Sequence, residues 1–217
     1  MKVLMLLPLI IFLSGCAVIE KARRSDELIQ EVANLKQNLE ELKKEKEREL
    51  SELEKAKRQL EQSLAKEIEE YKAKLEMTER GLVITFLSEV FFDSGRDIIR
   101  LDGKEVLQRV APILNDEVPN SYVAIEGHTD NEPIRYSGWK SNWELSSARA
   151  LAVLHYLIDE CKFEPQRLCA NGYGEYRPVA DNDTPQNKQK NRRVEIVILP
   201  EKISKVRESE VYLPKGD

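Results

Sequence analysis

Two stretches set the architecture of the C-terminal half: YVAIEGHTD at residues 122–130 and SNWELSSARALAVLHYLIDE at residues 141–160. Residues 122–126 are rich in aromatic and β-branched side chains and end at Gly127, which is typical of a strand followed by a turn. Ser141-Asn142-Trp143-Glu144 fits a capping box, so we expect a helix from Ser141 to about Glu160. Asp130 therefore ends a strand, and Arg149 lies on the helix that follows it.

The flanking sequence supplies the remaining elements of a small domain. Strand composition recurs at residues 82–86, 168–172 and 194–199, and an amphipathic helical segment covers residues 102–115. The order is β-α-β-α-β, with room for a further short strand. The sequence therefore predicts an α+β domain at residues 81–200, with helices packed on one face of a small sheet.

A long charged segment precedes this domain. Residues 20–80 contain 15 Lys or Arg and 17 Asp or Glu, and neither Pro nor Gly interrupts residues 17–80. Because apolar residues recur with a mean period of about 3.6, we expect a coiled-coil rod at residues 26–80, on the order of 75–80 Å long. Such a seam favours self-association over a solitary charged helix. The seam is formed by Leu28, Val32, Leu35, Leu39, Leu42, Lys46, Leu50, Leu53, Lys57, Leu60, Leu64, Ile68, Tyr71 and Leu75.

The N-terminus has the pattern of an export signal. Lys2 precedes an apolar run at residues 3–13, which is too short for a spanning helix of about 20 residues. Leu13-Ser14-Gly15-Cys16 follows and resembles the lipobox of bacterial lipoproteins. We expect a signal peptide at residues 1–15, lipidation at Cys16 and a short linker at residues 16–25. Acyl chains would then anchor the protein, and Ala17 favours the outer membrane.

Several separated motifs of the C-terminal half occur together in a known family. The motifs are EGHTD at 126–130, Asn142 with Leu145-Ser146, ARA at 148–150, GYGE at 172–175 with Pro178, and NRRVE at 191–195. Together they resemble the OmpA-like peptidoglycan-binding domain over residues 84–199. The sequences of residues 131–134 and 141–146 are most similar to the MotB branch of that family, the flagellar stator subunit.

The resemblance implies binding to diaminopimelate of the peptidoglycan stem peptide. The Asp of its HTD motif falls on Asp130, and the Arg of its LS-x-x-RA motif falls on Arg149. This pair suits a zwitterion, because a carboxylate binds the ammonium and a planar guanidinium binds the carboxylate. The secondary contacts are Thr129, Asn142, Leu145 and Arg193, although one of the two adjacent arginines, Arg192 or Arg193, is expected to brace the sheet. Lys188 stands where the family has Arg, which puts a contact there in doubt.

Other chemistry is weakly represented. Cys161 and Cys169 either form a disulfide, which an oxidising compartment permits, or are two buried thiols. The two histidines, His128 and His155, lack metal-ligand spacing, and His128 is expected to buttress the turn before Asp130. Neither a nucleophile–base arrangement nor a phosphate-binding glycine loop is present, and the net charge of −5 does not indicate nucleic-acid binding. We expect neither an enzyme nor a bound cofactor.

The combined pattern predicts a lipoprotein of the outer membrane that faces the periplasm. It would bind peptidoglycan noncovalently, tether the membrane to the cell wall and self-associate through its rod, with a polar tail at residues 201–217. Two alternatives are a MotB-like motor component and a structural part of a larger envelope complex. Residues 1–19 lack the membrane-embedded acidic residue that a stator requires.

Overall fold

The computed structural model describes residues 7–70 and 72–200, with side chains from residue 23 onward. The chain divides into two compact units, Met1–Arg48 and Glu49–Asp217. The signal-peptide start, the side chain of Cys16, Tyr71 and the tail at 201–217 lie outside the described part. Within that part, none of the helices carries an apolar stretch long enough to cross a membrane.

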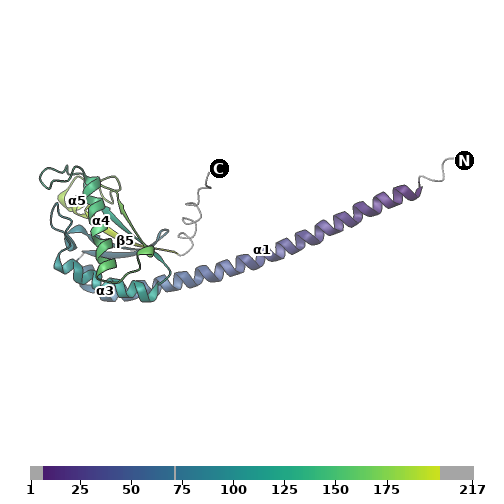
Figure 1. The fold of residues 1–217 in the computed structure, drawn as a ribbon, viewed down its shortest axis with the longest axis horizontal. Helices are drawn as coiled ribbons and strands as arrows, with labels where there is room; N and C mark the ends of the chain where they lie inside the picture. The colour runs from purple at the N-terminus through teal and green to yellow at the C-terminus, as the bar shows by residue number, and fades with distance from the viewer. Residues whose placement is uncertain (1–6, 71, 201–217) are drawn as a thin grey trace. The chain divides into compact units, whose positions relative to one another are not determined.

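A mixed five-stranded sheet forms the centre of the second unit (Figure 1). Its strand order is β1-β2-β5-β3-β4, and only the β3–β4 pair is parallel. β5 is buried along its whole length, because it lies between β2 and β3. The strands are β1 (Ala73–Thr78), β2 (Gly81–Leu87), β3 (Tyr122–His128), β4 (Leu168–Gly172) and β5 (Arg193–Leu199).

The helices lie on one face of this sheet, as the sequence predicts. Helices α3 (Leu101–Glu117) and α4 (Asn142–Asp159) share one apolar cluster with alternate residues of the central strands, including Ile84, Ile125 and Ile196. Figure 1 shows both helices beside the sheet. A smaller cluster of Val83, Ala124, Val197 and Leu199 lies on the other face. The predicted α+β class is confirmed. Short elements complete the unit: η1 (Ser88–Val90), α2 (Ala65–Glu69), η2 (Pro165–Arg167) and α5 (Pro185–Asn191).

The prediction of one helix running to residue 80 is wrong. Helix α1 spans Leu7–Ser63, α2 is a single short turn of helix, and residues 73–78 form β1. β1 pairs antiparallel with β2, and the hairpin between them closes at Gly81, whose φ of 113° an L side chain rarely adopts. Strand pairing at the open edge of β2 thus outweighs the local preference for helix. This is a tertiary effect, so the periodicity of the sequence does not reveal it.

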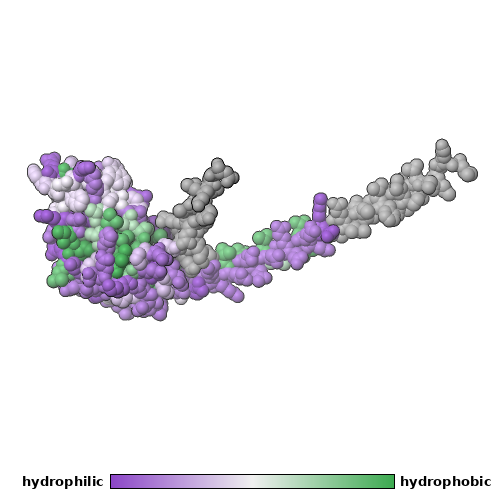
Figure 2. Space-filling view, in the orientation of Figure 1, coloured by the Kyte–Doolittle hydropathy of each residue, from purple (hydrophilic) through white to green (hydrophobic). Residues whose placement is uncertain are grey.

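The apolar seam of α1 has two different environments. Leu53, Ala56, Leu60 and Leu64 belong to the core of the second unit, and Lys55 of this stretch forms an ion pair with Glu117 of α3. Upstream, the seam is exposed in the single chain, as the hydrophobic residues along α1 in Figure 2 illustrate. The exposed fractions are 60% for Leu28, 49% for Val32, 59% for Leu35, 53% for Leu39, 53% for Leu42 and 47% for Leu50.

Candidate functional site

A cavity of about 900 Å³ opens where β3 ends and α4 begins. Because β3 and α4 hold the two motifs in register, residues 19 positions apart in sequence line one space. Five of the six predicted binding residues line this cavity: Thr129, Asp130, Asn142, Leu145 and Arg149. The rest of the wall comes from residues 88–96, the loop at residues 132–137 and Arg192.

Asp130 is held in place at the end of β3, with 5% of its surface exposed. Its Oδ1 accepts the backbone N–H of Glu132 at 3.2 Å. Its Oδ2 accepts Nη1 of Arg192 at 2.5 Å, so the carboxylate is already paired with a cation. Arg192 itself is 41% exposed and can move. The carboxylate therefore sits where an incoming ammonium group could share or replace this guanidinium.

Arg149 is the second charged group of the wall and is only 4% exposed. Its Nε donates to the carbonyl oxygen of Arg96 at 2.8 Å, and its Nη2 donates to that of Asp93 at 3.1 Å. Phe92 lies under the guanidinium, 5.2 Å from the ring centroid. Burial, and then the charge of Arg192, lower the pKa of Arg149 to about 10, so it stays protonated at neutral pH.

Arg149 and Asp130 are neighbours rather than an ion pair. Across the part of the chain that the structure describes, Arg149 has backbone carbonyls as hydrogen-bond acceptors, and Asp130 is paired with Arg192. The charge of Asp130 nevertheless acts on Arg149 through space. Two opposite charges thus face one cavity without neutralising each other directly, which is the arrangement that a zwitterionic ligand requires.

Asn142 and Thr129 fix the backbone around Asp130. Nδ2 of Asn142 donates to the carbonyl oxygens of Asp130 and Glu132, at 3.3 and 3.1 Å, and to Oε2 of Glu175 at 2.9 Å. The Thr129 hydroxyl donates to the Asp130 carbonyl oxygen at 2.9 Å. The first turn of α4 is therefore tied to the loop that carries Asp130, which limits movement of the carboxylate.

Of the two adjacent arginines, the structure places Arg192 at the cavity and Arg193 elsewhere. Arg193 begins β5 and points to the sheet face opposite α4, where it binds Glu195 at 2.7 Å and the Arg177 carbonyl oxygen at 3.1 Å. Arg193, predicted as a secondary contact, is therefore the arginine that braces the sheet, and it does not line the cavity. Lys188 forms an ion pair with Glu132 at the rim and does not line the cavity.

Residues 91–192, which include every residue of the cavity wall except Ser88 and Glu89, match the family model described as OmpA family. This segment is therefore an OmpA-family domain. The resemblance inferred from the sequence motifs is thereby confirmed. The OmpA-family match leaves α1, α2, β1, β2, η1 and β5 outside its limits.

The proteins that this chain resembles include motility proteins and a cell wall anchor. Motility protein B of Bacillus subtilis is 41% identical over 149 residues, which cover 69% of this chain and 57% of that protein. The cell wall anchor of the T6SS from Pseudomonas aeruginosa has a TM-score of 0.59 at 32% identity, over 65% of this chain and 96% of that one. The periplasmic domain of Helicobacter pylori MotB has a TM-score of 0.56 at 28% identity, over 65% and 93%. The matches span between 48% and 57% of the length of the first curated relatives.

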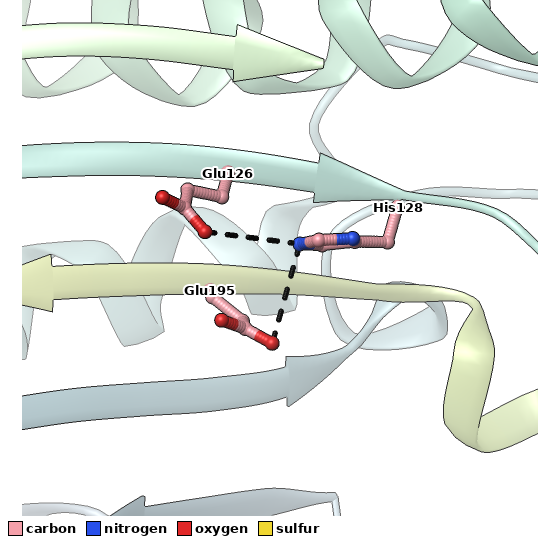
Figure 3. Close-up of side chains that lie close together, drawn as sticks. All are labelled: Glu126, His128 and Glu195. Atoms are coloured by element: carbon pink, nitrogen blue, oxygen red, sulfur yellow. Dashed lines mark ion pairs between the residues drawn. The ribbon is translucent and has the colours of Figure 1, made fainter. Parts of the chain in front are cut away.

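A second polar cluster of this OmpA-family domain lies on the face opposite the helices (Figure 3). Nε2 of His128 lies 4.0 Å from a carboxylate oxygen of Glu126 and 4.0 Å from one of Glu195. These three ligand atoms are close enough to surround a metal ion. However, Arg80 binds both carboxylates at 2.7 and 2.5 Å, and Arg193 also binds Glu195. A divalent cation would have to compete with two guanidinium groups for the same oxygens, so the cluster favours a structural role.

His128 is neutral in this setting. Burial first, and then the charge of Arg193, lower its pKa from 6.5 to about 3. Its ring stacks on Tyr173, with 5.2 Å between centroids, and it is 2% exposed. The position next to Thr129 fits the expected role of supporting the turn that carries Asp130.

The two cysteines of the domain are not joined by a disulfide. Cys161 packs against the helix-side core, whereas Cys169 packs against the small cluster on the other face of the sheet. A bridge would have to pass through the sheet, so the disulfide alternative is wrong for this fold.

Proposed function

We propose that this domain binds peptidoglycan noncovalently through the diaminopimelate of its stem peptide. The single observation that carries the proposal is the pair of opposite charges, Asp130 and Arg149, on the wall of one cavity without an ion pair between them. An ammonium and a carboxylate on one ligand carbon atom satisfy both groups at once. The similarity to a protein described as a cell wall anchor supports the same ligand.

Each ligand group has a partner of suitable chemistry. The ammonium binds Asp130, which requires Arg192 to move or to share the carboxylate. The ligand carboxylate binds Arg149, and the displaced Arg192 can donate to it as well. Asn142 and Thr129 act through the backbone of Asp130 rather than by direct contact. Binding proceeds without bond breakage, so the protein acts as a binder and not as an enzyme.

Sedimentation with purified sacculi tests this site. The wild-type chain is expected to pellet, and the double variant Asp130→Ala, Arg149→Ala is expected to remain in the supernatant. Because Arg149 also holds two backbone carbonyls, circular dichroism must show that the variant is folded. Lys188→Ala is the matched control, since Lys188 carries charge near the rim but does not line the cavity. Full sedimentation of the folded double variant would refute the site.

We propose further that the chain is an outer-membrane lipoprotein, anchored through Cys16, and that it faces the periplasm and links that membrane to the wall. Mass spectrometry of the mature N-terminus tests the anchor, because lipidation adds acyl chains to Cys16. A processed, acylated Cys16 is expected. Retention of residues 1–15 would refute the lipoprotein assignment, and fractionation distinguishes the two membranes.

We propose that the exposed seam of α1 pairs with a second copy of the chain. Six seam residues between Leu28 and Leu50 are about half exposed in the single chain, which leaves an apolar stripe in water, with Lys46 at one seam position. Sedimentation equilibrium is expected to give an oligomer, and the double variant Leu35→Glu, Leu42→Glu is expected to give a monomer. An oligomer that survives both substitutions would refute pairing along this stripe.

The relatives named Motility protein B favour a second candidate, a component of a motility machine. The two candidates differ in their partners: a motor component binds another membrane protein, whereas a tether needs only lipid and wall. Crosslinking from positions along residues 28–50 separates them. Contacts between copies of this chain support the tether, and a distinct crosslinked protein supports the machine component.

A further inference from the structure

Two exposed aromatic rings stack on each other beside the start of α4. The centroids of Trp143 and Tyr176 lie 5.1 Å apart with an interplanar angle of 22°. Trp143 is 47% exposed and Tyr176 is 63% exposed, although aromatic rings of this size normally bury most of their surface. An exposed aromatic stack mounted on rigid elements is a typical feature of a contact surface.

The stack is fixed from behind. Trp143 lies against Gly174, where an added β-carbon would come within 3.6 Å of Cδ2 of the indole. Gly174 has a φ of +53° and its N–H donates to the Ser146 hydroxyl at 2.9 Å, so the loop is tied to α4. Because Trp143 is backed by this glycine and covered by Tyr176, the outer ring face of Tyr176 forms the accessible platform.

The platform is connected to the cavity through one side chain. Asn142, which lines the cavity, precedes Trp143 and donates to Glu175, which precedes Tyr176. The stack is thus held at the same end of α4 as the proposed peptide site, but the two rings are not part of the cavity wall. The stack and the cavity are therefore joined by one hydrogen bond between residues that are adjacent to the two rings in sequence.

We propose that the Trp143–Tyr176 stack is a subsite for the glycan strand, on which one pyranose ring packs flat against Tyr176. This inference rests on the proposed peptidoglycan binding, because the stem peptide is attached to a strand of amino sugars. The axial C–H groups of a pyranose form an apolar face, which an aromatic ring covers while the hydroxyl groups stay in water. The negative ring faces of an uncharged aromatic stack fit a neutral sugar better than an anionic side chain.

Calorimetry with two probes tests the subsite in the full-length chain. The probes are the tripeptide stem ending in diaminopimelate and the same tripeptide carried on its disaccharide. The wild-type chain is expected to bind the disaccharide form about three- to tenfold more tightly. Tyr176→Ala is expected to remove that difference and to leave the affinity for the tripeptide unchanged. Tyr176→Phe, which keeps the ring, is the matched control and should behave as wild type.

The outcomes separate the two proposals. If the wild-type chain binds both probes equally, or if Tyr176→Ala weakens both equally, the sugar subsite is refuted while the peptide site stands. If Asp130→Ala fails to weaken the tripeptide, the peptide site itself is refuted. Because Tyr176 is an exposed loop residue, its replacement leaves the core untouched, and a folded variant can be measured.

Discussion

The buried His128 should make the stability of the domain depend on pH in a specific window. Its pKa falls from 6.5 to about 3 in the folded chain, mainly through burial. Below pH 6.5 the His128 imidazole is protonated in the unfolded chain but stays neutral in the folded chain. Stability is therefore complete above about pH 6.5 and is lost as the pH falls towards 3. Each pH unit inside this window costs about 1.4 kcal/mol, so the loss between pH 7 and pH 5 is about 2 kcal/mol.

Urea unfolding of the wild-type chain and of His128→Gln measures this contribution. Other groups titrate in both proteins, so the quantity to follow is the difference in unfolding free energy between them. That difference should change by about 2 kcal/mol between pH 7 and pH 5, with the wild-type chain losing more. The chain has only two histidines, so a histidine NMR titration assigns the pKa directly. A difference that stays constant with pH, or a His128 that titrates near 6.5 in the folded chain, would refute the reasoning.

Three further substitutions probe the fold around the site. Arg80→Ala leaves the carboxylates of Glu126 and Glu195 without a shared cation. Because Arg80 is 44% exposed, we expect the free energy of unfolding in urea to fall by only about 1–2 kcal/mol, and the pKa of His128 to rise. An unchanged NMR titration of His128 would contradict this. Gly127→Ala brings a β-carbon to 2.1 Å from a backbone oxygen of α4, so a loss of about 1–3 kcal/mol is expected by thermal unfolding; wild-type stability would contradict the close approach of β3 and α4. Leu60→Ala creates a cavity at a fully buried position and should lower the free energy of unfolding by about 2–5 kcal/mol. Leu39→Ala, at an exposed position of the same seam, should leave the unfolding of the domain unchanged. Equal losses in the two variants would contradict the division of the seam into a buried and an exposed part.

The sequence identified the sheet strands at residues 82–86, 122–126, 168–172 and 194–199 and both large helices to within a few residues. It did so because each has a clear period and a clear boundary, such as the capping box at Ser141. It failed beyond α2, where the helical period continues but residues 73–78 form β1. Leu60 and Leu64 fit a coiled-coil seam and a domain core equally well, since both environments select the same residue type. The structure decides between them, because both side chains are fully buried in the core of the second unit.

Most of the site was also predicted from the sequence. The motifs pointed to five residues that line the cavity: Thr129, Asp130, Asn142, Leu145 and Arg149. They did not identify Arg192 as the arginine bound to Asp130. Which of two adjacent residues points to a given face depends on the register of β5. The alternation of Arg193, Val194, Glu195 and Ile196 puts Arg193 on the face of Glu195, opposite the helix-side core, but Arg192 lies before β5, so its direction does not follow from the strand pattern.

The packing of α1 into the domain has a mechanical consequence. In the proposed tether, tension enters the second unit at Leu53 and Leu60, two α1 residues that are buried in its core. The ligand cavity lies at the end of β3, beyond β2 and β5 in the sheet order. In that proposed role, the load would therefore pass through this apolar core before it reaches the cavity.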